Sequence, residues 1–354
     1  MHAAYGPARP ALAADRRQSD GKLFAETGRT VAGMADEDMH GVALVQRHGA
    51  TVAERAGGIA DLGYGCPCIR STRFQICSLS KQFAAAAVLL LVDRGRVTLD
   101  DPAERWFSEC PEDWRPITVR HLLTHTSGLG HWPDCPDLDL GRPVPREQQL
   151  ELFQRMPLLS RPGNRWRYSS PGYVLLGWIV QEASGQPYAS FLAEHIFAPL
   201  GLRSTSAGDA PGGPGMARGY RSGQPVRSFD LGTASLGAGD VWSTADDLVR
   251  WDDALAAGEL LTPGLRREML TAHAPIPPGQ VADPTWIASG YGYGWFVGTA
   301  AGRRSYFHPG DNPGYLAFNA WLPDHDIRLA VLVNEETTDL DELLGELLRL
   351  AVSD

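Results

Sequence analysis

Lysine is almost absent from this 354-residue sequence, which carries nearly all of its positive charge on arginine. Only Lys22 and Lys81 occur, and the formal net charge is −10. A shortage of positive charge argues against nucleic acid or an anionic membrane surface as a partner, because both attract basic patches. The apolar runs are short as well. The longest of them, residues 83–92, cannot span a bilayer.

Targeting and cofactor motifs are also missing. Residues 1–20 contain no apolar core of the length that a secretory signal needs, so we expect a cytoplasmic protein. The five cysteines are an odd number, which fits reduced thiols better than a disulfide framework. Cys66 and Cys68 form C-x-C without a second pair at zinc spacing, and no H-E-x-x-H, P-loop or dinucleotide fingerprint occurs. The sequence therefore predicts no metal and no cofactor.

Strand-like patterns stand at both ends of the chain and helical patterns in its middle. Alternating apolar residues over 41–49 and 50–61 predict a hairpin, whereas residues 80–101 are apolar on nearly all sides, as in a buried helix. Further helices are predicted over 22–37, 171–184, 188–201 and 339–352, and further strands over 291–300, 314–322 and 327–335.

This arrangement predicts an α+β fold with two lobes. An antiparallel sheet flanked by terminal helices would combine residues from about 21–70 and 240–354, and a helical lobe would occupy about 71–239. We expect residues 1–20 to be a flexible leader and 21–354 to form a single catalytic domain. The cleft between the lobes is the expected place for a site.

The clearest chemical motif is Ser78-Leu79-Ser80-Lys81. In a chain with only two lysines, the expected number of S-x-x-K motifs that arise by chance is roughly a tenth. On a helix, this spacing puts Ser78 and Lys81 on one face. A serine hydroxyl needs a base to become a nucleophile, and lysine can serve when burial lowers its pKa, whereas arginine stays protonated. The alternative is a serine that caps the helix and a lysine that reaches solvent.

Two further segments could contribute to the chemistry. Tyr168, in Tyr-Ser-Ser, could relay protons if positive charge lowers its pKa, although the same sequence is common in loops. His308, in His-Pro-Gly, stands between two strand-like segments, where it could orient an acyl group or form part of an ordinary turn. Gly310 would let a substrate backbone approach closely. We interpret His121 and His125 as structural, holding a helix end and a loop together.

Together these motifs resemble the serine β-lactamase and penicillin-binding-protein superfamily, in the branch of class C β-lactamases, D-aminopeptidases and family VIII esterases. Residues 78–81 are similar to the S-x-x-K motif of this superfamily, and residues 168–170 are similar to its Tyr-x-Asn motif. Residues 308–310 are similar to its Lys-Thr-Gly or His-x-Gly motif. The segments 121–129, 237–251 and 291–295 also resemble recurrent family segments. The resemblance extends over about residues 22–350 and implies a β-lactamase/transpeptidase-like fold.

The resemblance also implies roles. Ser78 would be the acylated nucleophile, Lys81 its base, and Tyr168 the group that passes a proton to the leaving group. His308 would take the binding place of the usual lysine. The oxyanion hole would consist of the backbone N–H groups of Ser78 and Asp311. Donors of this kind contribute about 2.7–4 kcal/mol each to transition-state stabilisation.

Two departures from the family pattern bear on the substrate. Ser170 stands where the family has the substrate-binding asparagine, and its shorter hydroxyl offers one donor instead of two. His308 replaces a permanent charge by one that is lost above about pH 6.5, which weakens carboxylate recognition. Both changes point away from strong peptidase or β-lactamase activity and toward esters or small amides.

The sequence thus predicts a serine hydrolase that acts through an acyl-enzyme on esters or small, possibly D-configured, amides. The same residues fit an acyltransferase or peptide-cyclising thioesterase of secondary metabolism, in which an amine or alcohol replaces water. They also fit a non-catalytic sensor that keeps the acyl group. The expected partner is a small-molecule or short-peptide acyl substrate, with no nucleic acid and no membrane, and the sequence leaves the oligomeric state open.

Overall fold

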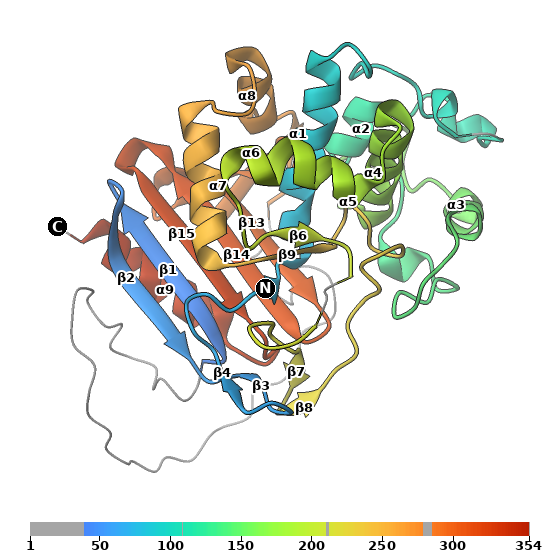
Figure 1. Ribbon diagram of the computed structural model, residues 1–354. Helices are drawn as coiled ribbons and strands as arrows, with labels where there is room; N and C mark the ends of the chain where they lie inside the picture. The colour runs from blue at the N-terminus through green and yellow to red at the C-terminus, as the bar shows by residue number, and fades with distance from the viewer. Residues whose placement is uncertain (1–38, 108, 210–211, 279–284, 354) are drawn as a thin grey trace, which may run out of the picture.

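The computed structural model describes residues 39–107, 109–209, 212–278 and 285–353. In this part of the chain, the largest sheet has the strand order β10-β11-β12-β13-β14-β15-β1-β2, and neighbouring strands are antiparallel (Figure 1). Its strands are β1 (Gly41–Arg47), β2 (Ala50–Gly57), β10 (Ala274–Pro275), β11 (Trp286–Tyr291), β12 (Phe296–Ala300), β13 (Arg303–Asn312), β14 (Tyr315–Leu322) and β15 (Ile327–Val333). The first described strands therefore complete a sheet that the C-terminal part of the chain begins.

The sheet is buried on both faces because its side chains alternate between two apolar cores. On β1, Val45 packs in the same core as Leu329 of β15, to which it is paired in register, whereas Leu44 packs in the other core. Helix α9 (Leu340–Val352) covers the first face with its leucines. Its N-cap Asp339 accepts the N–H of Glu342, which satisfies one of the free donors of the first turn.

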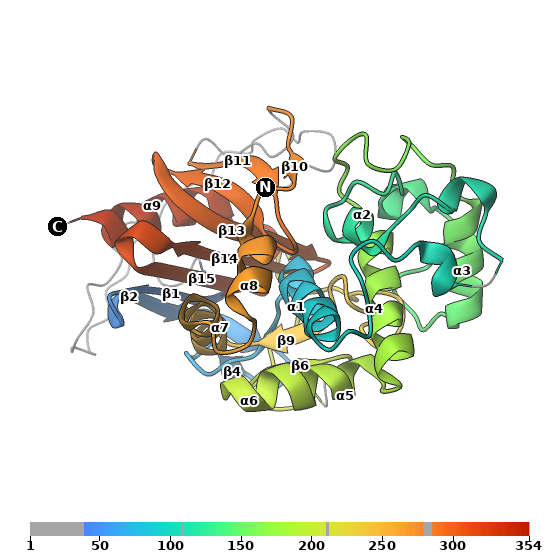
Figure 2. The same ribbon diagram turned by 90° about the horizontal axis from the view of Figure 1, so that it is seen from above.

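The other face is covered by the helical part of the molecule, seen from above in Figure 2. Its central helix is α1 (Ser80–Asp93), which is buried from Ser80 to Leu91. The remaining helices are α2 (Val119–Leu123), α3 (Arg146–Arg155), α4 (Ser170–Ser184), α5 (Tyr188–Leu192), α6 (Ala198–Leu200), α7 (Ala245–Ala257) and α8 (Pro263–Leu270). The smaller sheets contain β3 (Ile59–Asp61) with β4 (Cys66–Pro67), β5 (Phe74–Gln75) with β9 (Val241–Ser243) and β6 (Ser206–Ala207), and β7 (Tyr220–Arg221) with β8 (Gln224–Pro225).

The predicted α+β architecture, an antiparallel sheet combined with helices, is confirmed. The hairpin and the closing helix lie where the sequence predicts them. The buried helix begins at Ser80 as predicted but ends at Asp93 instead of continuing to residue 101. The single strand predicted over 291–300 is wrong, because β11 ends at Tyr291 and β12 begins at Phe296. Gly294, with φ +76°, turns the chain between them, and a Cβ there would lie 2.7 Å from the carbonyl oxygen of Lys81. The leader 1–20 and the helix predicted over 22–37 lie outside the described residues.

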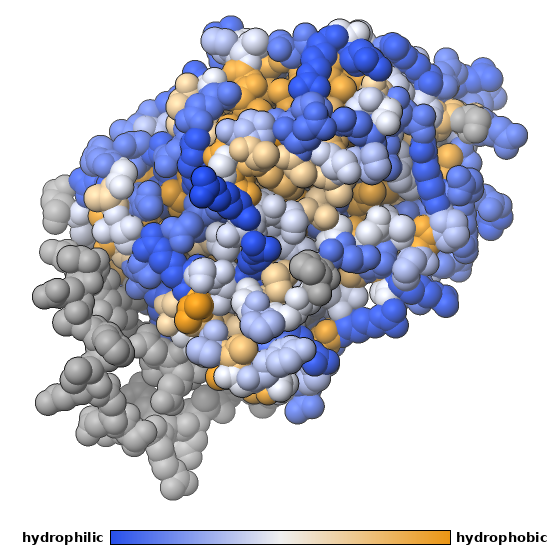
Figure 3. All heavy atoms as spheres, viewed as in Figure 1, coloured by the Kyte–Doolittle hydropathy of each residue, from blue (hydrophilic) through white to orange (hydrophobic). Residues whose placement is uncertain are grey.

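The surface is mostly hydrophilic on the face shown in Figure 3, where apolar side chains gather mainly in the upper middle, around α1 and α6. Among the residues that the structure describes, no helix is long and apolar enough to cross a membrane.

Candidate active site

Ser78 lies on a tight turn that leads from β5 into α1. The turn is a single stretch of 3-10 helix, Cys77–Leu79, and it buries Cys77 and Leu79 completely while Ser78 remains partly exposed. Cys77 has a φ of 54°, which is uncommon for a residue with a side chain and marks a constrained backbone. The N–H of Ser78 falls in the first turn of the helix, where no intrahelical acceptor exists. The turn thus presents both a hydroxyl and a backbone donor.

Lys81 lies directly beneath this hydroxyl. Its side chain is fully buried, and its Nζ lies 3.1 Å from Ser78 Oγ and donates to the carbonyl oxygen of Ala238 at 2.6 Å. Burial lowers the pKa of Lys81 well below 10.5, because the charged form loses its hydration. A neutral amine that gives one hydrogen to Ala238 keeps its lone pair for the proton of Ser78. The predicted side-by-side arrangement of Ser78 and Lys81 is therefore present, and the alternative of a lysine that reaches solvent is wrong.

Asp240 is a second ionisable group near the base, which the motif comparison did not single out. It is buried, and its Oδ1 has no hydrogen-bond partner among the described residues. Burial raises the pKa of Asp240 to about 7, and the charge of Lys81 acts in the opposite direction. The carboxylate in turn favours the protonated form of Lys81, but burial has the larger effect on the lysine.

Tyr168 lies at the end of the loop that leads into α4. Ser169 is the N-cap of that helix, and its Oγ accepts the N–H of Gly172 at 3.2 Å. The Tyr168 ring is buried, and Lys81 Nζ lies 4.9 Å from its centroid. A phenol held this close to the base is in position to exchange protons with the same small group of atoms.

Two histidines that the sequence analysis did not place in the site surround Tyr168. The rings of His125 and His131 lie 4.4 Å and 5.4 Å from it, centroid to centroid. Each accepts a backbone N–H on Nδ1, His125 from Ser169 at 3.1 Å and His131 from Ser170 at 3.3 Å. Burial lowers the pKa of His125 well below its usual range and that of His131 to about 3, so both rings are neutral. The predicted structural role fits His125. The clustering of histidines between residues 121 and 131 was the feature of the sequence that could have indicated their place in the site.

His308 lies within β13. The sequence suggested a position between two strands instead. Its Nδ1 donates to the carbonyl oxygen of Pro309 at 2.6 Å, and its Nε2 then accepts the hydroxyl of Tyr291 at 3.0 Å. Burial, with a smaller effect from Lys81, lowers the pKa of His308 to about 3. The expectation that this ring loses its charge near pH 6.5 is therefore wrong, because it is neutral well below that pH.

The fold itself requires a glycine at position 310. A Cβ at this position would lie 2.7 Å from the carbonyl oxygen of Ile76 and 2.9 Å from the Cβ of Cys77. The space that the glycine leaves is filled by the turn that carries Ser78. Strand β12 pairs with β13 only as far as Phe307, so the edge of β13 beyond that residue faces this turn. Asp311 follows on the same edge and is exposed.

Ser170, the residue in the place of the family asparagine, is the first residue of α4 and is almost completely buried.

The cysteines are all free thiols, namely Cys66, Cys68, Cys77, Cys110 and Cys135. Within the described ranges, no group of three His, Cys, Asp or Glu side chains could hold a metal ion. The site thus consists of a buried amine, a serine, a phenol and neutral imidazoles.

Comparisons with known proteins place this chain in one family. The model of a family described as Beta-lactamase matches residues 28–353. The esterase EstB of Burkholderia gladioli is 30% identical over 355 residues, which cover 84% of this chain and 85% of that protein. A D-aminopeptidase of Brucella anthropi is 28% identical over 303 residues, covering 84% and 56%. The structure of a D-amino acid amidase from Ochrobactrum anthropi SV3, complexed with D-phenylalanine, superposes with a TM-score of 0.77 at 26% identity, covering 89% and 96%.

Proposed function

Because this chain belongs to the beta-lactamase family and is a serine hydrolase of that family, we propose that it cleaves esters and small amides through an acyl-enzyme on Ser78. The family resemblance of the sequence motifs is thereby confirmed. The observation that carries the proposed roles is the 3.1 Å separation between Lys81 Nζ and Ser78 Oγ, with the lysine fully buried. We take residues 21–354 to act as one catalytic domain.

In the acylation step, Ser78 Oγ attacks the carbonyl carbon of the substrate while its proton passes to the lone pair of Lys81. Negative charge develops on the carbonyl oxygen, and the backbone N–H groups of Ser78 and Asp311 are the proposed donors to it. Support for this pair comes from the close packing of the β13 edge at Gly310 against the turn that carries Ser78. The position of both donors is fixed before the substrate arrives, so little reorganisation accompanies the reaction.

The leaving group then departs with a proton, which we assign to the relay from Lys81 through Tyr168. The 4.9 Å contact between Lys81 Nζ and the Tyr168 ring supports this route. Water then attacks the carbonyl carbon of the resulting ester while the same pair of residues takes its proton. The bond to Ser78 Oγ breaks, the proton passes from the pair to that oxygen, and the acid is released. The covalent route divides one difficult acyl transfer into two easier steps.

The neutral state of His308 bears on the substrate class. A ring whose pKa is about 3 carries no charge for a substrate carboxylate at neutral pH, and its two nitrogens already bind Pro309 and Tyr291. We therefore propose substrates without a carboxylate beside the scissile bond, namely esters and small D-configured amides. The names of the esterase and of the D-amino acid amidase agree with this class. We place the reaction in a reducing compartment, the cytoplasm, as the five free thiols suggest.

The test uses purified protein, p-nitrophenyl acetate and a fluorophosphonate probe. We expect turnover of the ester and a single adduct mapped by mass spectrometry to the peptide that contains Ser78. The Ser78→Ala variant measures the background ester hydrolysis that any protein surface supports. Turnover by that variant at the wild-type rate, or the absence of an adduct on Ser78 in the wild type, would contradict the proposal.

A further inference from the structure

A cavity of about 650 Å³ lies between the sheet and the helical part of the molecule, apart from the candidate active site. One side of it is formed by α2 and by loop residues 163–166, and the other by residues between 273 and 277. None of the candidate catalytic residues lines it. Its volume is in the range of small-molecule sites, which often lie between the parts of a fold.

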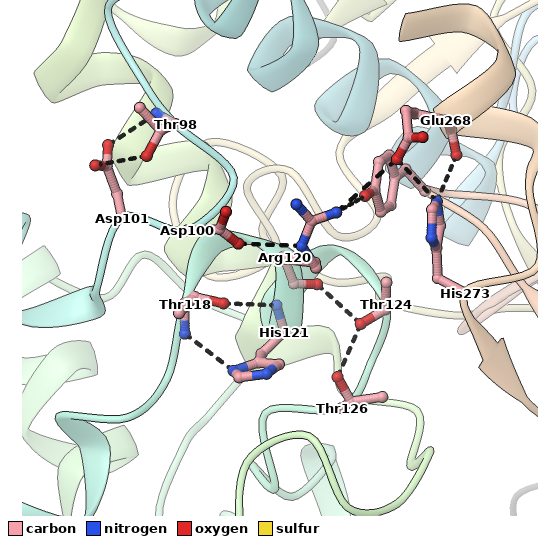
Figure 4. A network of polar contacts seen from close by, with 11 residues as sticks. Thr98, Asp100, Asp101, Thr118, Arg120, His121, Thr124, Thr126, Glu268 and His273 are labelled. Carbon is pink, nitrogen blue, oxygen red and sulfur yellow. Dashed lines mark hydrogen bonds and ion pairs between the residues drawn. The ribbon is translucent and has the colours of Figure 1, made fainter. Parts of the chain in front are cut away.

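Among the described residues that line this cavity there are two arginines and no acidic residue. Arg120 is held by three contacts (Figure 4). Its Nε lies 3.2 Å from Oδ1 of Asp100. Its Nη1 donates to the hydroxyl of Tyr293 at 2.8 Å and lies 3.9 Å from Oε2 of Glu268. The two carboxylates offset the charge of this guanidinium. Arg165 is exposed and forms no ion pair with an acid in the described part of the chain. Arg165 is thus the lining guanidinium that remains available to pair with an anionic group of a ligand.

Two threonine hydroxyls on the same wall can accept hydrogen bonds but cannot donate them. Thr124 Oγ1 donates its only proton to the carbonyl oxygen of Arg120 at 2.8 Å. Thr126 Oγ1 lies 2.8 Å from Thr124 Oγ1 and therefore donates to it (Figure 4). The lone pairs of Thr126 remain, so this part of the wall suits a ligand with an N–H or O–H donor.

Other lining residues offer flat or apolar surfaces, beside the polar His121 and Asn164. Trp166, in the loop before Tyr168, lines the cavity on one side, and Pro275 and Pro277 line it on the other. His273 is fixed by a flat stack on Tyr293, with 4.4 Å between the ring centroids. Such surfaces favour the planar body of an aromatic ligand.

We propose that this cavity is a second binding site, for a small aromatic carboxylate that also carries an N–H donor, such as an N-acylated aromatic amino acid. Its carboxylate pairs with Arg165, its N–H donates to Thr126, and its ring lies against Trp166. The site is separate from Ser78, so binding there does not require acylation.

N-Acetylphenylalanine is the probe, and isothermal titration calorimetry on the Ser78→Ala variant measures its binding without turnover. For a ligand of this size we expect one site per chain with a dissociation constant of about 1 mM. Arg165→Gln in that background should weaken binding by about three- to tenfold. Arg161→Gln is the matched control, because Arg161 is an exposed arginine in the same loop that does not line the cavity. Phenethylamine, with the same ring and a positive charge, should bind more weakly than the probe.

Three results would overturn the inference: no binding by the Ser78→Ala protein at about 10 mM probe, equal affinities of the Arg165→Gln and Arg161→Gln proteins, or equal affinities for the probe and phenethylamine. The second result would follow if the probe bound at a place where Arg165 takes no part. None of these readouts depends on ester hydrolysis, so the second site and the proposed catalytic function can fail independently.

Discussion

Replacing Lys81 by arginine tests the base most directly, because the substitution keeps a positive charge and removes only the ability to lose it. In the native site, the amine is fully buried and its Nζ lies 3.1 Å from Ser78 Oγ. A guanidinium stays protonated at every accessible pH, so it cannot take the proton of Ser78. Losing a general base costs about 10²–10⁴-fold in rate, which corresponds to about 2.7–5.4 kcal/mol of transition-state stabilisation.

The assay is kcat/KM for p-nitrophenyl acetate as a function of pH, with thermal unfolding of each protein as the control for folding. Burial holds the pKa of Lys81 well below 10.5, so the wild-type rate should rise with pH over a range below that value as the amine loses its proton. This rising limb should be absent in the variant.

A charged guanidinium in a buried position can also destabilise the protein, so a second variant is needed. Lys81→Met has a similar length, carries no charge and packs well in apolar surroundings. Both variants should lose at least about 10²-fold in kcat/KM. If either folds normally and retains a rate within about fivefold of the wild type, the reasoning about Lys81 is refuted.

Three further predictions follow from the site. Tyr168→Phe should lower kcat/KM for an amide by about 10²-fold and affect a p-nitrophenyl ester less, because nitrophenolate leaves without a proton; equal losses would contradict the relay. Gly310→Ala should lower the free energy of unfolding, measured in urea, by about 1–3 kcal/mol, because its Cβ would lie 2.7 Å from a carbonyl oxygen. Gly345→Ala is the control and should raise that free energy, because the space around its Cβ is open. A Gly310→Ala protein that is as stable as the wild type, or more stable, would show that the contact is not tight. The pKa of His308 is about 3 in the folded protein against 6.5 for a free ring, so the unfolded chain binds the extra proton and stability falls as the pH drops between those values. His308→Gln should reduce that slope by up to about 1.4 kcal/mol per pH unit, and equal slopes would count against a buried neutral ring.

The site explains why position 81 is a lysine in a chain that carries nearly all of its positive charge on arginine. The turn before α1, the carbonyl oxygen of Ala238 and the aromatic ring of Tyr168 all contact the same amine. Such surroundings exclude water and favour the neutral form. An arginine in this position would meet the same contacts with a charge that it could not lose.

The sequence by itself determined the features that depend on local patterns. The alternating segments predicted the hairpin of β1 and β2, and the continuous apolar run predicted the burial of α1, because the period of the pattern dictates which faces must be covered. The spacing of Ser78 and Lys81 and the scarcity of lysine pointed to the base, since helix geometry brings residues three apart onto one face.

Tertiary structure alone decided the properties that arise between distant segments. The neutral state of His308 comes from its burial and from the hydroxyl of Tyr291, and the need for Gly310 comes from the carbonyl oxygen of Ile76, more than two hundred positions away in the chain. The approach of His125 and His131 to Tyr168 likewise depends on how a loop packs against α4. A sequence pattern records which residues must be buried, but hydration, close contact and charge depend on which partners the fold brings to them.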